Sequence, residues 1–187
     1  VEANIQGMDM TFTIEKQVIF PDHSHTMTKT PFGNQTLVLA GDAGWATGPM
    51  GTRDLEGESL TDARTDMQTD MVAVLRNLDG LQCQALEPRE VEGRNCLPVH
   101  VTGIGDGYQI FFLDPGTHQV VMVQQPGVSP MTQAPVTQKV IVDEYGDLGG
   151  LNMPVKMRLT FDDELFGTIA VENFEVDAAV DQQLFQK

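Results

Sequence analysis

Positive charge is scarce in this chain. Its 187 residues include 11 Lys and Arg against 27 Asp and Glu, a net charge of −16. A surface this acidic repels the phosphates of nucleic acids and anionic membranes, so nucleic acid is excluded as a partner and an anionic membrane surface is disfavoured. Long hydrophobic runs are also missing. The longest, Met71 to Leu75, has five residues, whereas a transmembrane helix needs about 20.

Catalytic motifs are missing as well. The sequence contains no Gly-x-Ser-x-Gly, His-Glu-x-x-His, Gly-x-x-x-x-Gly-Lys or Gly-x-Gly-x-x-Gly pattern. The glycine-rich segment from Gly103 to Gly107 is not followed by the helix that a phosphate-binding loop requires. The sequence therefore predicts a protein without enzymatic activity and without a cofactor.

Histidines offer one weak metal motif. His23 and His25 would share a face of a strand, and Asp22 adjoins them, so this trio is a candidate metal site and a metal-dependent hydrolase is a third functional alternative. No second cluster of ligands accompanies the trio. We therefore expect solvated polar residues on an edge strand and assign no metal.

Only two cysteines are present, Cys83 and Cys96, so one disulfide is the maximum. If Glu92-Gly93 is a two-residue turn, Val91 pairs with Arg94 and Arg89 with Cys96. Cys83 is then about 20 Å from Cys96, too far for a bridge. Free thiols are the prediction, and a disulfide through a wider loop is the alternative.

Period-two alternation dominates the rest of the chain. Met8, Met10, Phe12 and Ile14 take one face of a first strand, and further short strands follow at the spacing of hairpins. A separate second strand is expected over 17–20, and 48–57 is expected to be a loop. About ten strands in all predict a mainly β (α+β) fold, a curved antiparallel sheet in one domain over residues 1–187.

One segment changes period. From Leu60 to Leu78, apolar residues recur at threes and fours, which predicts a single helix that covers the concave face of the sheet. Ser59 or Thr61 is the expected N-cap. Ten methionines are present, several on predicted inward faces, and methionine is common both in irregular cores and on surfaces that accept varied apolar ligands.

Short motifs along almost the whole chain resemble one family in their order and spacing. These motifs are Phe20-Pro21-Asp22, Pro31-Phe32-Gly33, Gly41 to Trp45, the segment from Leu60 to Leu78, Val91 to Arg94, Phe112 to Thr117, Asp143 to Tyr145, Gly150 to Pro154, Val176 to Asp181, and Leu184-Phe185. In them the chain resembles the LolA/LolB superfamily of bacterial outer-membrane lipoprotein-sorting proteins.

This resemblance implies an unclosed antiparallel β-barrel whose hydrophobic cavity binds lipids or the acyl chains of lipoproteins. It implies a periplasmic or outer-membrane-associated protein of the bacterial envelope. The residues that we expect to line the cavity, between sheet and helix, are Met10, Phe12, Trp45, Met67, Met71, Leu75 and Phe111.

Two departures from the family leave an alternative open. Family members begin with a helix before the first strand, which is missing here, and the basic residue near the end of their second strand appears as His25. Since the chain starts at Val1 within a strand-like pattern, we expect a processed protein or an excised domain whose signal peptide is not in this sequence. The alternative is a packed accessory domain that docks envelope proteins or another domain of its own chain, as in insulinase-type zinc peptidases.

Overall fold

The computed structural model describes residues 1–5, 10–104 and 107–187, and for Met10 it describes the backbone alone. In this part of the chain fourteen strands form an antiparallel sheet. The strands are β1 (Glu2–Ile5), β2 (Met10–Ile19), β3 (His23–Thr30), β4 (Gly33–Ala40), β5 (Ala43–Gly48), β6 (Gly51–Asp54), β7 (Gln82–Ala85), β8 (Arg89–Val91), β9 (Arg94–Ile104), β10 (Gly107–Leu113), β11 (Val120–Val128), β12 (Pro135–Leu148), β13 (Leu151–Phe161) and β14 (Glu164–Ala170).

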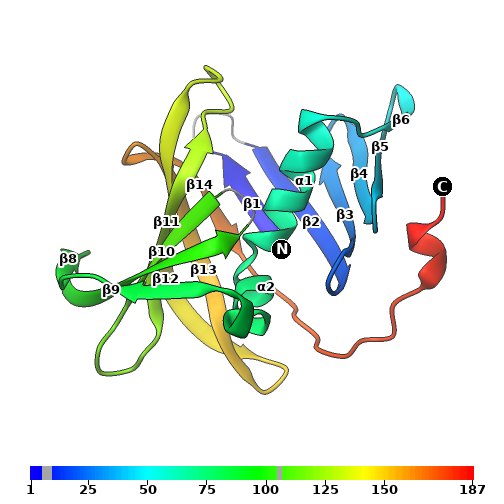
Figure 1. Ribbon diagram of the computed structural model, residues 1–187. Helices are drawn as coiled ribbons and strands as arrows, with labels where there is room; N and C mark the ends of the chain where they lie inside the picture. The colour runs from blue at the N-terminus through cyan, green and yellow to red at the C-terminus, as the bar shows by residue number, and fades with distance from the viewer. Residues whose placement is uncertain (6–9, 105–106) are drawn as a thin grey trace.

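The sheet consists of two meanders, the first formed by β1 to β6 and the second by β7 to β14. The spatial order is β6-β5-β4-β3-β2-β1-β14-β13-β12-β11-β10-β9-β7, with β8 paired to β9 alone. Strand β1 lies between β2 and β14 and joins the two meanders, while β6 and β7 form the two edges of the sheet (Figure 1). The predicted fold class, a curved unclosed antiparallel sheet with helices on its inner face, is confirmed.

Several boundaries differ from the expectation. The structure has more than ten strands because the short β1 and β6 were not predicted, and β6 falls within the expected loop. In addition, β7 and β8 are separate strands, whereas the cysteine argument treated them as one. The two strands expected between residues 8 and 20 are one continuous strand, β2. Met8, on which the first prediction rested, lies outside the described residues, as do positions 105 and 106 of the glycine-rich loop.

The predicted single helix is wrong, because Asp70 interrupts it. Helix α1 (Glu58–Gln68) has Thr69 as its C-cap, and α2 (Met71–Arg76) begins after Asp70. Asp70 is the N-cap of α2, and its carboxylate accepts the Val72 N–H at 3.0 Å. A 3₁₀ turn, η1 (Leu78–Gly80), follows. The cap of α1 also differs, since its N-cap is Gly57. Within the described residues no helix is long and apolar enough to cross a membrane.

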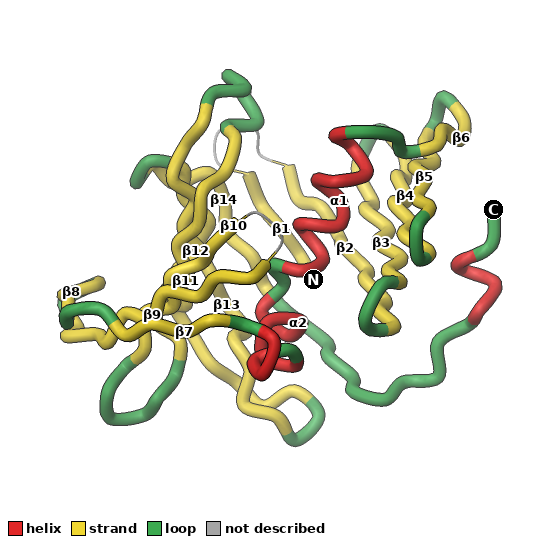
Figure 2. The backbone as a smooth tube through the Cα atoms, viewed as in Figure 1, coloured by secondary structure: helices red, strands yellow, loops and turns green. Residues whose placement is uncertain are grey.

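Both helices lie on the inner face of the sheet (Figure 2). The segment after β14 runs to the other meander and ends in a second 3₁₀ turn, η2 (Gln182–Phe185), on the outer face. There Phe185 packs against Val38 and Trp45. The sheet is therefore covered by helices on its inner face and, at one end, by the C-terminal segment on its outer face.

The junction of the two meanders is a close backbone contact. Gly167 of β14 pairs with Ile5 of β1, and a Cβ at Gly167 would overlap the backbone oxygen of Asn4. A glycine is therefore required at the centre of the sheet, where β1 and β14 meet.

Candidate functional site

The inner face of the sheet can be followed from the residues that touch α1. Val18 of β2 packs in the same cluster as Met67 of α1, so β2 turns this side chain toward the helix. Because side chains alternate along a strand, Phe12 and Ile14 lie on the same face as Val18. The helix side of β2 therefore continues as an apolar surface beyond the helix itself.

Cross-strand pairing carries this surface through the middle of the sheet, because directly paired residues share a face. Phe12 pairs with Ala3, Ala3 with Ile169, and Ile169 with Met157. From the other end, Val123 belongs to the α2 cluster and pairs with Val140. These two series of cross-strand pairs meet at β12 and β13.

We call the apolar residues between the two helix-covered regions the central face. It comprises Ala3, Ile5, Phe12, Ile14, Val140, Met157, Leu159 and Ile169. These eight are half-buried and none belongs to a buried core cluster, whereas Val142, which pairs with Met157 on the same face, is buried. The central face is therefore apolar but incompletely covered by the chain.

The regions on either side are packed. Under α1, Leu39 (2% exposed) lies against Leu55, Ala63 and Met67. Under α2, a second cluster contains Val74, Val101, Ile104 and Phe111, with Met71 partly buried against it. We call these two clusters the flanks. In them the side chains of the helices fill the space above the sheet.

The junction of the two helices is tied to both meanders. Asp70 pairs with Lys16 of β2 at 2.7 Å, and the Gln109 amide of β10 donates to the Thr69 carbonyl at 2.8 Å. Gln109 is 2% exposed and also donates to Gln125 at 2.6 Å. The break in the helix thus spans the inner face from one meander to the other.

Acidic residues gather at this junction. Partial burial raises the pKa of Asp66, the neighbouring Asp62 raises it further, and Lys16 opposes both. The folded protein therefore holds a proton on Asp66 more tightly than an unfolded chain does.

Four of the seven predicted cavity residues have side chains on or beside this inner face. Phe12 is on the central face, Met67 and Phe111 are buried in the flanks, and Met71 is partly buried beside Phe111. Met10 is paired with Ile5, a central-face residue, but its side chain lies outside the described residues.

Trp45 and Leu75 are not brought to this surface. Trp45 pairs with Val38 and lies on the outer face against Phe185, because the face of β5 that meets α1 carries Gly44 and Ala46 instead. Leu75 is 54% exposed on α2, since the break at Asp70 turns α2 so that Val74 meets the sheet.

Sequence reasoning missed most of the central face. β13 alternates over Met157 and Leu159 as clearly as β2 does, and this alternation was available in the sequence. What the sequence did not give is the pairing of β1 with β14, which places Ile169 beside Ala3.

The histidine pair lies on the outer face. His23 contacts Asp22, with Nδ1 2.7 Å from Oδ1, and its ring lies edge-on to Phe185 at 5.4 Å between centroids. His25 is buried and pairs with Val38. In the described part of the chain no group of three His, Cys, Asp or Glu side chains is arranged to hold a metal ion.

The cysteines are both free. The predicted turn at Glu92-Gly93 is correct, with Val91 paired to Arg94 and Arg89 to Cys96. Cys83 pairs farther along β9 with Val101. Cys96 is fully buried, and this burial raises the pKa of its thiol, whereas Cys83 is exposed.

The described residues form clefts at two places away from the seven predicted residues, none of which lines either cleft. One, of about 320 Å³, lies between the β10–β11 loop and β12; Arg94, Asp114 and Tyr145 are in its wall. Burial raises the pKa of Tyr145, whose hydroxyl donates to the Val120 carbonyl. The other, of about 520 Å³, lies between the β12–β13 hairpin and residues 174–178.

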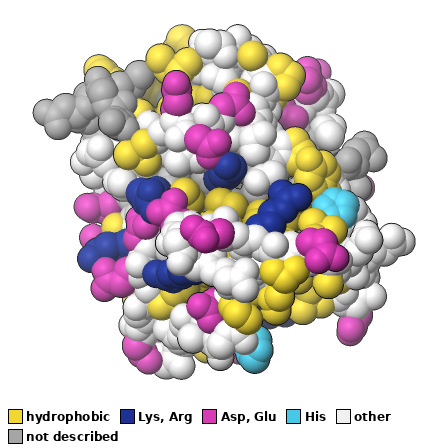
Figure 3. Space-filling model, turned by 90° about the vertical axis from the view of Figure 1, so that its left-hand side faces the viewer, with side chains coloured by type: hydrophobic (Ala, Val, Ile, Leu, Met, Phe, Trp, Pro, Cys, Tyr) yellow, Lys and Arg dark blue, Asp and Glu magenta, His cyan; other side chains and the backbone are white. Residues whose placement is uncertain are grey.

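Charged side chains of both signs cover the outer side of the second meander (Figure 3). Arg158 binds Asp143 through Nε, at 2.9 and 3.0 Å, and Glu92 through a terminal nitrogen at 3.0 Å. These bonds raise the pKa of Arg158 and hold the β8–β9 turn against the sheet. Lys156 pairs with Glu144 nearby. The basic side chains Arg158 and Lys156 on this face are therefore paired with acidic neighbours.

Comparison with known proteins identifies the fold. No protein-family model and no curated protein matches the sequence. Among solved structures, a LolA superfamily protein from Nitrosomonas europaea matches with a TM-score of 0.64 at 8% identity and covers 100% of this chain and 86% of its own.

Two further structures are similar. An outer membrane lipoprotein-sorting protein domain from Vibrio parahaemolyticus has 9% identity, and a DUF1329 family protein from Desulfovibrio piger ATCC 29098 has 14%. Each has a TM-score of 0.59 and covers 99% of this chain and 86% of its own. The fold is therefore LolA/LolB-like, as the sequence motifs predicted.

Proposed function

We propose that the protein binds a lipid, or the acyl chain of a lipoprotein, on the central face, without catalysing a reaction. The proposed setting is lipoprotein sorting or transport in a bacterial envelope, with the protein periplasmic or associated with the outer membrane. This proposal moves the ligand away from Trp45 and Leu75 and toward the residues of β1, β2, β12, β13 and β14.

The observation that carries the proposal is the incomplete burial of the central face. Eight apolar side chains from five adjacent strands are half-buried, while the flanks on either side are packed. A contiguous apolar surface left uncovered by its own chain is typical of a ligand or partner site. Each methylene buried there contributes about 0.8 kcal/mol, so a single acyl chain gives reversible capture.

The fold supports this choice of ligand. The similar structure from Vibrio parahaemolyticus is described as an outer membrane lipoprotein-sorting protein domain. Binding and release of an acyl chain require no nucleophile or metal, consistent with a sequence that carries no catalytic motif.

Native mass spectrometry of the purified protein, with organic extraction of bound material, is the first experiment. A lipid close to one equivalent supports the proposal and identifies the ligand class. The protein is then stripped of lipid and titrated with a fluorescent fatty acid. Absence of saturable binding to the stripped protein would overturn the proposal.

A pair of variants on one strand locates the site. Ile169 belongs to the central face, and the adjacent Thr168 is exposed on the opposite side of β14. Ile169→Asp is expected to weaken fatty-acid binding at least tenfold, and Thr168→Asp to leave it unchanged. Both variants are first compared with wild type by thermal unfolding. Equal binding by a folded Ile169→Asp variant would place the ligand elsewhere.

A second candidate function is the packed accessory domain. It is favoured by one observation, that both described clefts lie away from the seven predicted residues. For such a domain, lipid extraction yields nothing, and the stripped protein gives no saturable fatty-acid signal. The same titration therefore separates the two functions.

A further inference from the structure

The two edges of the unclosed sheet differ in their protection. At one edge, β6 carries Arg53 and Asp54, and Asp54 accepts a hydrogen bond from Lys187 at the end of the chain at 2.5 Å. At the other edge, β7 has the sequence Gln-Cys-Gln-Ala, which contains no charged residue. All four of its residues are exposed. Charged side chains are one of the ways in which proteins protect an edge strand, and the four residues of β7 include none.

The unpaired backbone groups of β7 can be assigned from its register. The Leu86 N–H donates to the Pro98 carbonyl at 2.9 Å, so Leu86 is in a hydrogen-bonded pair with β9. Because such pairs alternate along an antiparallel ladder, Gln84 and Gln82 also bond β9. The N–H and C=O groups of Cys83 and Ala85 therefore point away from the sheet.

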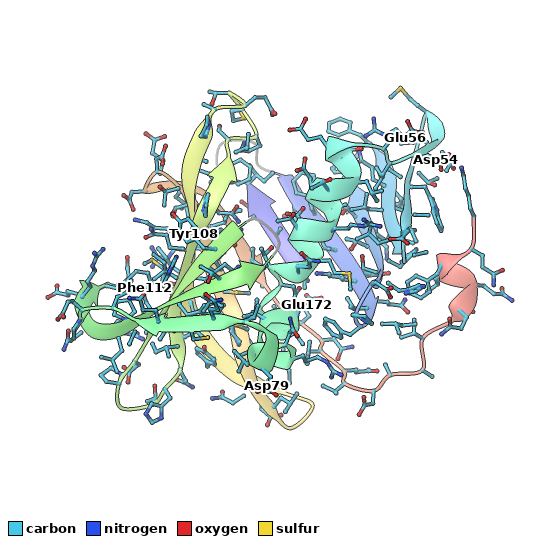
Figure 4. The ribbon with its side chains drawn as sticks, in the orientation of Figure 1. Asp54, Glu56, Asp79, Tyr108, Phe112 and Glu172 are labelled. Atoms are coloured by element: carbon cyan, nitrogen blue, oxygen red, sulfur yellow. The ribbon has the colours of Figure 1, made fainter. Side chains whose placement is uncertain are left out.

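The surroundings of this edge define the partner. Residues 77–90 include Asp79, Glu87 and Glu90 and a single basic residue, Arg89, within a chain of net charge −16. Figure 4 shows Asp79 at the end of the helical segment that precedes β7. Acidic residues on both sides of an open ladder favour a strand with basic ends.

An apolar contact is available next to the ladder. Leu78, in η1, is 46% exposed, and Leu75, on the last turn of α2, is 54% exposed. They are three residues apart, so they lie on one side of this helical segment. Both leucines lie a few residues before β7, where they are available to contact a strand added at this edge. The cavity prediction had assigned Leu75 to the lipid site instead.

We propose that β7 is a docking edge, at which an extended segment of another protein, flanked by Lys or Arg, adds a strand to the sheet. Main-chain bonds to Cys83 and Ala85 supply the affinity, and the acidic flanks select a basic partner. A second copy of this chain is disfavoured as the occupant, because it would bring the same acidic flanks and a second net charge of −16 to this edge.

The experiment uses a fluorescent synthetic peptide, Lys-Val-Thr-Val-Thr-Val-Lys with blocked ends, and measures its binding by anisotropy. Ala85→Pro removes an outward N–H without removing a bond to β9, and edge strands accept proline at such positions. Thr52→Pro is the matched control, since the register of β5 and β6 directs the Thr52 N–H away from the sheet at the opposite edge.

The expected result is binding that Ala85→Pro weakens at least tenfold and Thr52→Pro leaves within twofold. A peptide N-methylated on the amides facing β7, tested on wild type, is expected to lose binding equally, which avoids any folding defect of the variant. Glutamate in place of lysine is expected to weaken binding, and bound peptide to slow alkylation of Cys83 by iodoacetamide.

Three outcomes would overturn the proposal. They are no binding at millimolar peptide, full binding of the N-methylated peptide, and equal binding of the glutamate-flanked peptide. A dimer of the protein alone that Ala85→Pro dissociates would also overturn it, by making a second copy the occupant. Sedimentation of both proteins tests this last outcome.

Discussion

The flanks and the central face are made of the same kinds of residue but have different partners. Leu39 of β4 is buried against Met67 of α1, whereas Leu159 and Met157 are half-buried and no helix of the described residues packs against them. Composition and alternation are alike in the two regions. What distinguishes the packed flanks from the half-buried central face is therefore the position of two short helices, and not the strands beneath them.

The largest expected effect tests the packing difference directly. Leu39→Ala removes a fully buried side chain and is expected to lower the free energy of unfolding by about 2–5 kcal/mol. Leu159→Ala, on the central face, removes the same atoms from a half-buried position and is expected to cost about 1 kcal/mol. Urea unfolding of the two variants measures both; equal losses would mean that the central face is core.

Fatty-acid binding to the central face is expected to stabilise the folded protein. A fatty acid at 100 times its Kd adds about 2.7 kcal/mol to the free energy of unfolding when it binds the folded state alone. The gain is expected for wild type and for Thr168→Asp, and is expected to vanish for Ile169→Asp. Thermal unfolding with and without fatty acid measures it. A gain retained by Ile169→Asp would remove the distinction between the two regions.

A smaller loss of stability is expected from substitutions at the junction of α1 and α2. Asp70→Ala removes both the N-cap of α2 and the ion pair with Lys16, and is expected to cost about 1–2 kcal/mol. Asp70→Asn keeps a capping side chain and loses only the ion pair, whose partners are about one-third exposed, so about 0–1 kcal/mol is expected. If the two variants lose equal stability, the cap does not hold α2 in place.

The smallest effect is a pH dependence. The pKa of Asp66 is raised in the folded protein, so between its unfolded and folded pKa values the folded state binds more protons. The contribution of Asp66 to stability is therefore present at acid pH and lost as the pH rises through the raised pKa. Asp66→Asn is expected to remove this slope and to raise the thermal midpoint slightly at neutral pH. Asp62→Asn, a neighbour on α1, is the control, with a smaller change.

Local signals predicted local structure well. A two-residue turn fixes the register of a hairpin, and for this reason Glu92-Gly93 gave the pairing of Arg89 with Cys96 correctly. The helix break escaped prediction because the apolar spacing continues through Asp70 from Met67 to Val74, while capping geometry is set by a single side chain.

Faces were harder to predict than strands. Alternation divides β5 into two faces but does not say which one meets a helix, and a large apolar residue was assigned inward. The structure uses Gly44 and Ala46 there, because the helix approaches closely, and sends Trp45 outward to Phe185. The outward choice depends on a C-terminal segment about 140 residues away, which no local pattern contains.

The position of β1 has a consequence for the order in which the protein is made. Glu2 pairs with Ala170, so the contact that joins the two meanders links two strands that are far apart in the sequence. The strands of the first meander can pair early in synthesis, but the ladder between β1 and β14 has to wait until β14 has been made. Until then β1 has β2 on one side and an open edge on the other. Closing so long a loop is entropically costly and slow, and the half-made sheet exposes its apolar central strands meanwhile. The nascent chain is thus most vulnerable to aggregation just before β14 is complete.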